Sequence, residues 1–165
     1  MGPGLEDKEM ADYFWGKLEF PAALIEAEVT KALEAEGVEM DNLDPSGHDD
    51  DSAWIEDGIF TIENSQARYG QFEDLENLLR QKGIPFDRQS GQKYEYYPEL
   101  VIFRPAKNCA PALSLYLPLV GSSDKPGIIA QDIRDLIPQG IEAIQAYLDE
   151  HVPNYPPLGE YVKVA

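Results

Sequence analysis

Apolar and polar residues alternate over residues 12–20, which predicts a β-strand with two different faces. Phe14, Leu18 and Phe20 fall on one face, and Lys17 falls on the other. Successive side chains of a strand point to opposite sides of the sheet, so the face with the two phenylalanines should pack on the core. The same analysis of spacing predicts the other elements of the chain.

Helical spacing of apolar residues predicts four helices. The first covers residues 21–36, because proline is tolerated in a first helical turn and glycine follows the last residue. A second amphipathic helix is predicted over residues 72–82, again with glycine beyond its end. Pro138 should divide the last helical stretch into a short helix near 128–136 and a longer one near 139–150.

Four further segments have strand character. Residues 58–63 are rich in β-branched and aromatic side chains, and residues 84–97 resemble a β-hairpin with a Ser-Gly pair at its tip. The run 99–104 is almost continuously apolar, and leucines alternate with small or polar residues over 113–119. The segment 84–97 therefore predicts the two strands of a hairpin, and each of the other three segments predicts one strand.

This order of elements predicts an α+β fold, with a mixed β-sheet and helices packed on one face. The opening βαβ unit would be a right-handed crossover if its two strands were parallel neighbours. A ferredoxin-like arrangement is compatible with the order but does not match it cleanly. We expect a disordered leader over residues 1–11, one domain over 12–152 and a proline-rich extended tail over 153–165.

The distribution of charge along the chain indicates a class of function in addition to a fold. The net charge is −18, and residues 1–67 hold 18 carboxylates against three lysines. The stretch between Lys31 and Arg68 contains no base at all. Such a field repels nucleic acids and anionic membranes and attracts cations and basic protein surfaces.

The acidic stretch therefore predicts a protein-binding module that presents carboxylates to a basic partner. A sharper hypothesis is a nucleic-acid mimic that inhibits a DNA- or RNA-binding protein, because antirestriction and anti-CRISPR inhibitors are often small and acidic. Acidity that only solubilises the protein explains the charge about as well. The candidate partner-binding residues are Glu34, Glu36, Glu39, Asp41, Asp44, Asp49, Asp50, Asp51, Glu56 and Asp57.

Aromatic residues form a second candidate surface. Tyr94, Tyr96 and Tyr97 lie in the second arm of the predicted hairpin, and Tyr13 and Trp15 lie in the first strand. Aromatic side chains are enriched at the centres of protein interfaces, so these residues are compatible with a homodimer. Cross-strand packing explains them equally well.

The alternative from a different class is a small-molecule-binding domain or a metal-independent enzyme, with its site near the hairpin at 84–97. Arg68, Arg88, Lys93 and Arg104 could line an anion pocket there, or could simply neutralise the acidic half of the molecule. No glycine-rich phosphate loop, nucleophile elbow or zinc-protease motif is present in the sequence. We therefore favour a binding protein over an enzyme.

Neither a metal nor a cofactor is predicted. A calcium loop counted from Asp44 fails, because Asp49 replaces its glycine and Ile55 replaces its final glutamate. One cysteine, Cys109, and two separated histidines make a poor zinc ligand set. A lone thiol fits a reducing compartment, so we expect a cytoplasmic protein, and His151 is predicted to interact with the carboxyl end of the last helix.

Overall fold

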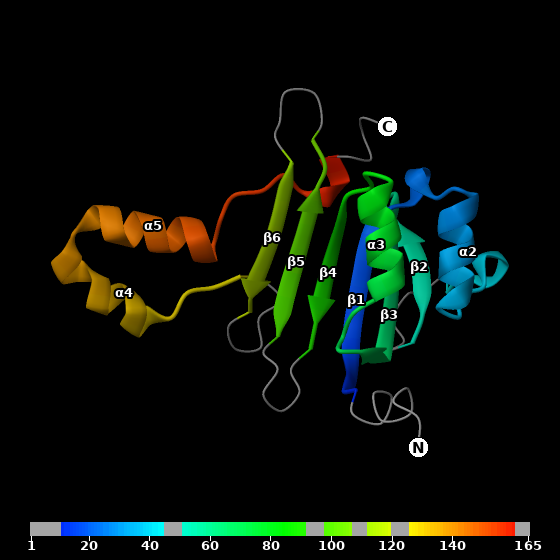
Figure 1. Ribbon diagram of the computed structural model, residues 1–165, viewed down its shortest axis with the longest axis horizontal. Coiled ribbons are helices and arrows are strands. Elements are labelled where there is room, and N and C mark those ends of the chain that lie inside the picture. Colours follow the sequence, from blue (N-terminus) through cyan, green and yellow to red (C-terminus); the bar gives the residue numbers. More distant parts are fainter. Residues whose placement is uncertain (1–10, 45–50, 92–97, 107–111, 120–125, 161–165) are drawn as a thin grey trace, which may run out of the picture.

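A computed structural model describes residues 11–44, 51–91, 98–106, 112–119 and 126–160 (Figure 1). Its centre is a six-stranded sheet in the order β2-β3-β1-β4-β5-β6. Every neighbouring pair of strands is antiparallel, so the fold is α+β but the predicted mixed sheet is wrong. The strands are β1 (Tyr13–Pro21), β2 (Ala53–Glu56), β3 (Ile59–Arg68), β4 (Phe86–Ser90), β5 (Glu99–Arg104) and β6 (Leu113–Pro118).

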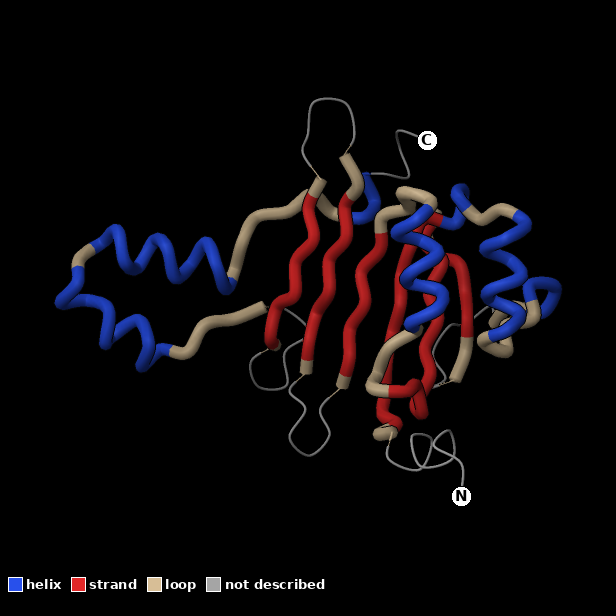
Figure 2. The backbone as a smooth tube through the Cα atoms, viewed as in Figure 1, coloured by secondary structure: helices blue, strands red, loops and turns tan. Residues whose placement is uncertain are grey.

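The helices occupy two separate places. Figure 2 shows two of them against the β2-to-β4 part of the sheet, while two others extend beyond the β6 edge. We call the sheet face that carries α2 and α3 the helix face, and the opposite one the reverse face. The helical segments are η1 (Ala22–Leu24), α2 (Ala27–Ala35), η2 (Met40–Asn42), α3 (Glu73–Gln81), α4 (Ala130–Leu136), η3 (Ile137–Gln139) and α5 (Ile141–His151).

The strand order explains why the opening crossover differs from the prediction. β1 and β2 are both antiparallel to β3, so they run parallel to each other with β3 between them. β3 and β4 are related in the same way across β1. Helices α2 and α3 therefore each connect parallel strands that are not neighbours. The six-strand order also differs from the suggested ferredoxin-like sheet, because β5 and β6 extend it.

The sequence analysis missed β2, although the chain carries a signal for it. Asp57 and Gly58 join β2 to β3, and both have positive φ angles, 50° and 79°. A two-residue Asp-Gly turn of this kind matches the twist of a hairpin. The Asp57-Gly58 pair therefore indicates a β2–β3 hairpin. The sequence analysis predicts an acidic loop followed by a single strand in its place.

The first helix begins later than predicted. β1 continues through Pro21, which keeps an extended ψ of 125°, and η1 intervenes before α2 starts at Ala27. The N–H of Ala22 donates to the carbonyl oxygen of Gly58 at 2.9 Å, so the end of β1 is held by the β2–β3 turn. This long-range contact competes with the local preference of proline for a helical first turn.

Two apolar clusters, one on each face, pack the sheet against the segments that cover it. On the helix face, α2 and α3 bury Leu18 and Phe20 of β1, as the alternation predicted. On the reverse face, Leu100 and Ile102 of β5 pack with Tyr155. The predicted tail thus includes a segment that lies on the sheet. Its Leu158 is buried.

Candidate functional site: an acidic hollow

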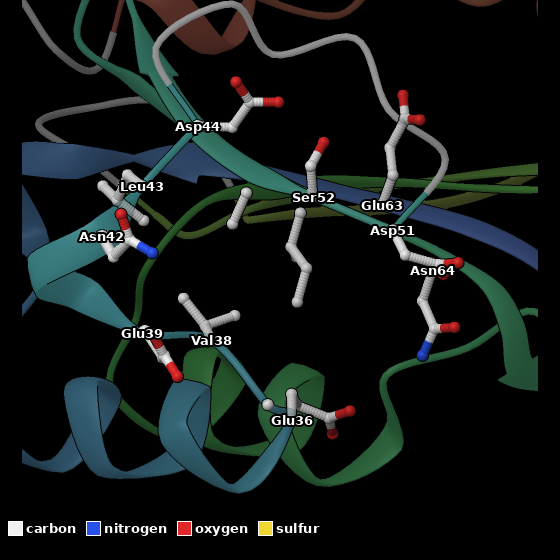
Figure 3. A pocket seen from close by; sticks show the side chains of 13 residues that line it. Glu36, Val38, Glu39, Asn42, Leu43, Asp44, Asp51, Ser52, Glu63 and Asn64 are labelled. Atoms are coloured by element: carbon white, nitrogen blue, oxygen red, sulfur yellow. The ribbon is translucent and has the colours of Figure 1, made fainter.

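A hollow of about 540 Å³ lies between the segment that follows α2 and the adjoining parts of β2 and β3. Figure 3 shows acidic side chains around this hollow, with Val38 among them. Among the described residues, neither lysine nor arginine lines it. Its apolar lining comes from Val38, Leu43, Ala53 and Ile62, and its carboxylates are Glu36, Glu39, Asp44, Asp51 and Glu63.

The end of α2 places the first two carboxylates. The N–H of Val38 donates to the carbonyl oxygen of Leu33 at 3.0 Å, and Gly37 has a φ of 87°. This is the hydrogen-bond pattern of a Schellman ending, in which the left-handed residue reverses the chain. Val38 is then buried, so Glu36 and Glu39 are fixed on either side of an anchored residue.

The opposite wall is held by Asp51. Its carboxylate accepts the N–H of Ser65 at 2.8 Å and the hydroxyl of the same serine at 2.9 Å. The N–H of Glu63 donates to the carbonyl oxygen of Ser52, and that of Asp44 donates to Ala53, both at 2.9 Å. Asp51 therefore shapes the hollow by joining the start of β2 to β3.

The surroundings of Glu36 are unfavourable to its ionised carboxylate. Partial burial raises the pKa of Glu36 above its usual 4.5, and the negative charges of Asp74 and Glu76 raise it further. Both of those residues belong to α3, which packs beside α2. A cation brought to this place would reverse the effect, because an opposite charge favours the ionised carboxylate.

Glu36→Gln is expected to stabilise the fold at pH 7 by no more than about 1 kcal/mol, since Glu36 is partly exposed. The pKa of Glu36 is higher in the folded protein than in the unfolded chain. The folded protein therefore binds more protons than the unfolded chain above pH 4.5, and its stability falls as the pH rises from 4.5 through the pKa of the folded state. Urea unfolding of both proteins at several pH values should show a smaller decline for the variant. An equal or steeper decline in the variant would contradict the assignment.

The other predicted acidic residues do not all join the hollow. Glu34 and Asp41 are exposed near it on α2 and η2. Glu56 and Asp57 are exposed at the opposite end of β2, where the strand turns into β3. Asp49 and Asp50 lie outside the described residues. Sequence analysis missed Glu63, although it belongs to the same base-free run.

The structure describes only some of the residues named in the aromatic and anion-pocket hypotheses. Tyr94, Tyr96, Tyr97 and Lys93 lie outside the described residues, as does Cys109. The remaining arginines do not converge, because Arg88 lies on the helix face and Arg104 lies on the reverse face.

A second hollow, of about 330 Å³, lies between α3 and strands β4 to β6. Arg88 lines it, but its guanidinium is occupied by two carboxylates. Nε lies 3.1 Å from Glu76 Oε1, and Nη1 lies 3.1 Å from Glu99 Oε1. We therefore regard Arg88 as part of a structural ion pair of the helix face.

On the reverse face, Arg104 is buried and pairs with Asp87 at 2.7 Å. Burial raises the pKa of Asp87, and the hydrogen bond and charge of Arg104 oppose that rise. Nε of Arg104 also donates to the carbonyl oxygen of Pro156 at 2.9 Å. This arginine therefore attaches the C-terminal segment to the sheet.

The described ranges show neither a metal-binding cluster nor a membrane-spanning helix. They contain no group of three or more histidine, cysteine or acidic residues arranged to hold a metal ion. None of their helices has the length and apolar content of a membrane span. His151 ends α5 as predicted, where Nδ1 donates to the carbonyl oxygen of Tyr147 at 2.9 Å.

Comparisons of the chain with protein-family models, with curated protein sequences and with solved structures give no match. The geometry described above is therefore the basis for any functional conclusion.

Proposed function

We propose that this protein is an acidic protein-binding module whose hollow receives a lysine or arginine side chain from a basic protein partner. The observation that carries the proposal is the lining of the hollow, where the described part of the chain gathers five carboxylates and no lysine or arginine. Opposite charges across an interface speed encounter and fix its register.

The apolar part of the lining supports a long basic side chain over a simple inorganic cation. Lysine and arginine place an apolar stem along apolar surface while the charged head reaches polar groups. Leu43 and Ala53, which are partly exposed, supply such a surface in the hollow, and Glu36 and Glu39 supply the charge at its rim. The partner's cation would also relieve the repulsion that Glu36 experiences from Asp74.

Nucleic-acid mimicry is the narrower form of this proposal. The exposed carboxylates of α2, η2 and the β2–β3 turn continue the negative surface beyond the hollow. A protein that binds nucleic acid offers a matching row of basic side chains, because duplex DNA carries a charge about every 1.7 Å of its axis. In this form, the partner is a DNA- or RNA-binding protein that the module inhibits.

The test is a pull-down from cell lysate with tagged wild-type protein and two charge variants. Glu36→Lys with Glu39→Lys changes the hollow, whereas Glu150→Lys with Glu160→Lys makes the same change in net charge at exposed residues elsewhere. We expect a stoichiometric basic partner that the hollow variant loses and the control retains. Competing DNA or RNA should displace that partner if the module is a mimic.

Equal retention by the wild type and the hollow variant would reject the hollow as the binding site. Equal loss from both charge variants would show that only net charge matters, which would reject the proposal as well. A partner that depends on the hollow but resists competing DNA and RNA would keep the binding module and reject mimicry.

A further inference from the structure

Helices α4 and α5 form a free-standing arm together with η3. Figure 1 shows this arm extending beyond β6, on the side away from α3. No residue of α4, η3 or α5 is buried. At the tip of the arm, Ile137 is 61% exposed and Ile141 is 80% exposed; the acidic residue Asp135 lies two residues before Ile137, and Glu142 follows Ile141 directly.

The arm is too small to be stable by itself. Its helices have 7 and 11 residues, whereas isolated helices need about 12–15 residues to be even marginal in water. Its inner contacts include a hydrogen bond from the Tyr147 hydroxyl to Asp132 at 3.0 Å and the stacking of His151 on the same tyrosine. Amphipathic helices gain most of their stability from packing, so this arm requires a covering surface.

A complementary surface lies on the same chain, beside α3. The Arg80 guanidinium stands 5.0 Å from the ring centres of both Phe86 and Phe103 and 5.9 Å from that of Tyr116. Tyr116 is 61% exposed, and the 330 Å³ hollow lies next to it. We call Arg80, Phe103 and Tyr116 the arginine platform.

Arg80 has no carboxylate partner among the described residues, and it shares this property with Lys31, Arg68 and Arg134. Its side chain donates to the Ser114 and Tyr116 hydroxyls, each at 3.2 Å, and no ion pair is formed. Three carboxylates line this hollow, Glu73, Glu76 and Glu99, and the last two are held by Arg88. In a chain with a net charge of −18, this cation is therefore available to an acidic ligand.

We propose that the arm tip of one copy docks on the arginine platform of a second copy, and that the exchange is reciprocal. The tip offers isoleucines flanked by acids, and the platform offers aromatic rings flanked by a cation. Because the chain carries both halves, a two-fold axis would use each surface twice in one self-complementary interface. This inference is independent of the acidic hollow, which lies at the other end of the sheet.

The arm is tied in a way that keeps it from its own platform. At its start, Leu119 and Pro126 form a β-bridge beside β6. At its end, Arg104 binds the Pro156 carbonyl oxygen, and Leu158 is buried. Both attachments hold the arm beyond the β6 edge, so a second copy is the nearest source of a matching arm.

Strand β6, next to the arm, adds to the surface that a second copy can contact. Specific interfaces typically use about 20–30 residues on each side. The arm and β6 together contain about that many residues, and β6 is the edge strand of the sheet. Exposed strand edges are a common starting point for association between chains.

Sedimentation velocity of the full chain tests the proposal, with wild type expected to be a dimer at micromolar concentrations. Ile141→Asp should weaken the dimer at least about tenfold, since central apolar contacts carry most interface energy. Ile55→Asp is the matched control, because Ile55 is 48% exposed on β2 at the opposite edge. Circular dichroism should show both variants folded.

Charge exchange tests which surfaces meet. We expect Arg80→Glu to be monomeric, because its platform then repels the acidic tip. The variant with Asp135→Arg and Glu142→Arg should also be monomeric, since its basic tip meets Arg80. An equimolar mixture of the two variants should restore a dimer, because both contacts then join opposite charges.

Four results would overturn the proposal. Wild-type protein could sediment as a monomer, or Arg80→Glu could leave the dimer intact, as expected if the arms packed only on each other. The mixture of charge variants could also remain monomeric although each variant is folded. A dimer that survives Ile141→Asp but not Ile55→Asp would place the interface on the β2 edge and reject the arm.

Discussion

Glu76→Ala is expected to lower the free energy of unfolding by about 3 kcal/mol, which is a large part of the stability of a small domain. Glu76 is buried in α3, where its Oε2 accepts the N–H of Phe72 at 2.7 Å and its Oε1 accepts Arg88 Nε at 3.1 Å. Removing it leaves an orphaned N–H at the start of the helix and a buried arginine with one partner fewer. Glu99 remains beside Arg88, so the loss should stay at the lower end of the range for broken buried pairs.

Urea unfolding followed by tryptophan fluorescence measures this loss. Glu73→Ala is the matched control, because Glu73 lies in the same first helical turn but is exposed, and its replacement should cost less than about 0.5 kcal/mol. Replacing both partners with apolar residues, as in Glu76→Leu with Arg88→Met, should recover most of the stability. Similar losses for Glu73→Ala and Glu76→Ala would show that the buried pair has no special importance.

Gly70→Ala is expected to cost about 3 kcal/mol, for two reasons that add. Gly70 has a φ of 64°, which an alanine adopts only with strain. A Cβ there would also lie 2.6 Å from the Phe14 ring and 2.9 Å from Ser90 Cβ, both of which belong to strands of the sheet. The carbonyl oxygen of Gly70 accepts the Ser90 hydroxyl at 2.8 Å, so the backbone cannot move away freely.

Gly37→Ala separates the two causes. Gly37 has a φ of 87°, but a Cβ there would meet nothing within 4 Å. It should therefore cost only the backbone strain, about 1 kcal/mol. If thermal or urea unfolding gave the two alanine variants equal losses, the close packing around Gly70 would not be important for stability.

The spacing of apolar residues along the chain predicted most helices and strands but not which strands pair. The alternation of Phe14, Leu18 and Phe20 gave the correct buried face of β1, since a period of two leaves no other choice. The start of α2 was wrong, because the hydrogen bond between Ala22 and Gly58 joins residues far apart in the sequence. No local preference contains such a contact.

The candidate site was predictable in composition but not in shape. The base-free run contained four of the carboxylates predicted for partner binding that now line the hollow. Only the β2–β3 hairpin and the ending of α2 bring these carboxylates together. Glu56 and Asp57 lie instead at the other end of β2. The arginine platform had no sequence signal, because Arg80, Phe103 and Tyr116 come from three separate elements.

The sequence by itself determined the α+β class, the position of most helices and strands, and the acidic character of the protein. These properties depend on residue type and on spacing within one element, so they can be read along the chain. Tertiary structure alone decided the antiparallel order of the sheet, the hollow that Glu36 and Glu39 line together with residues of β3, and the separation of the arm from Arg80. Each of these depends on which distant segments pair, and pairing is set by the free energy of the whole fold.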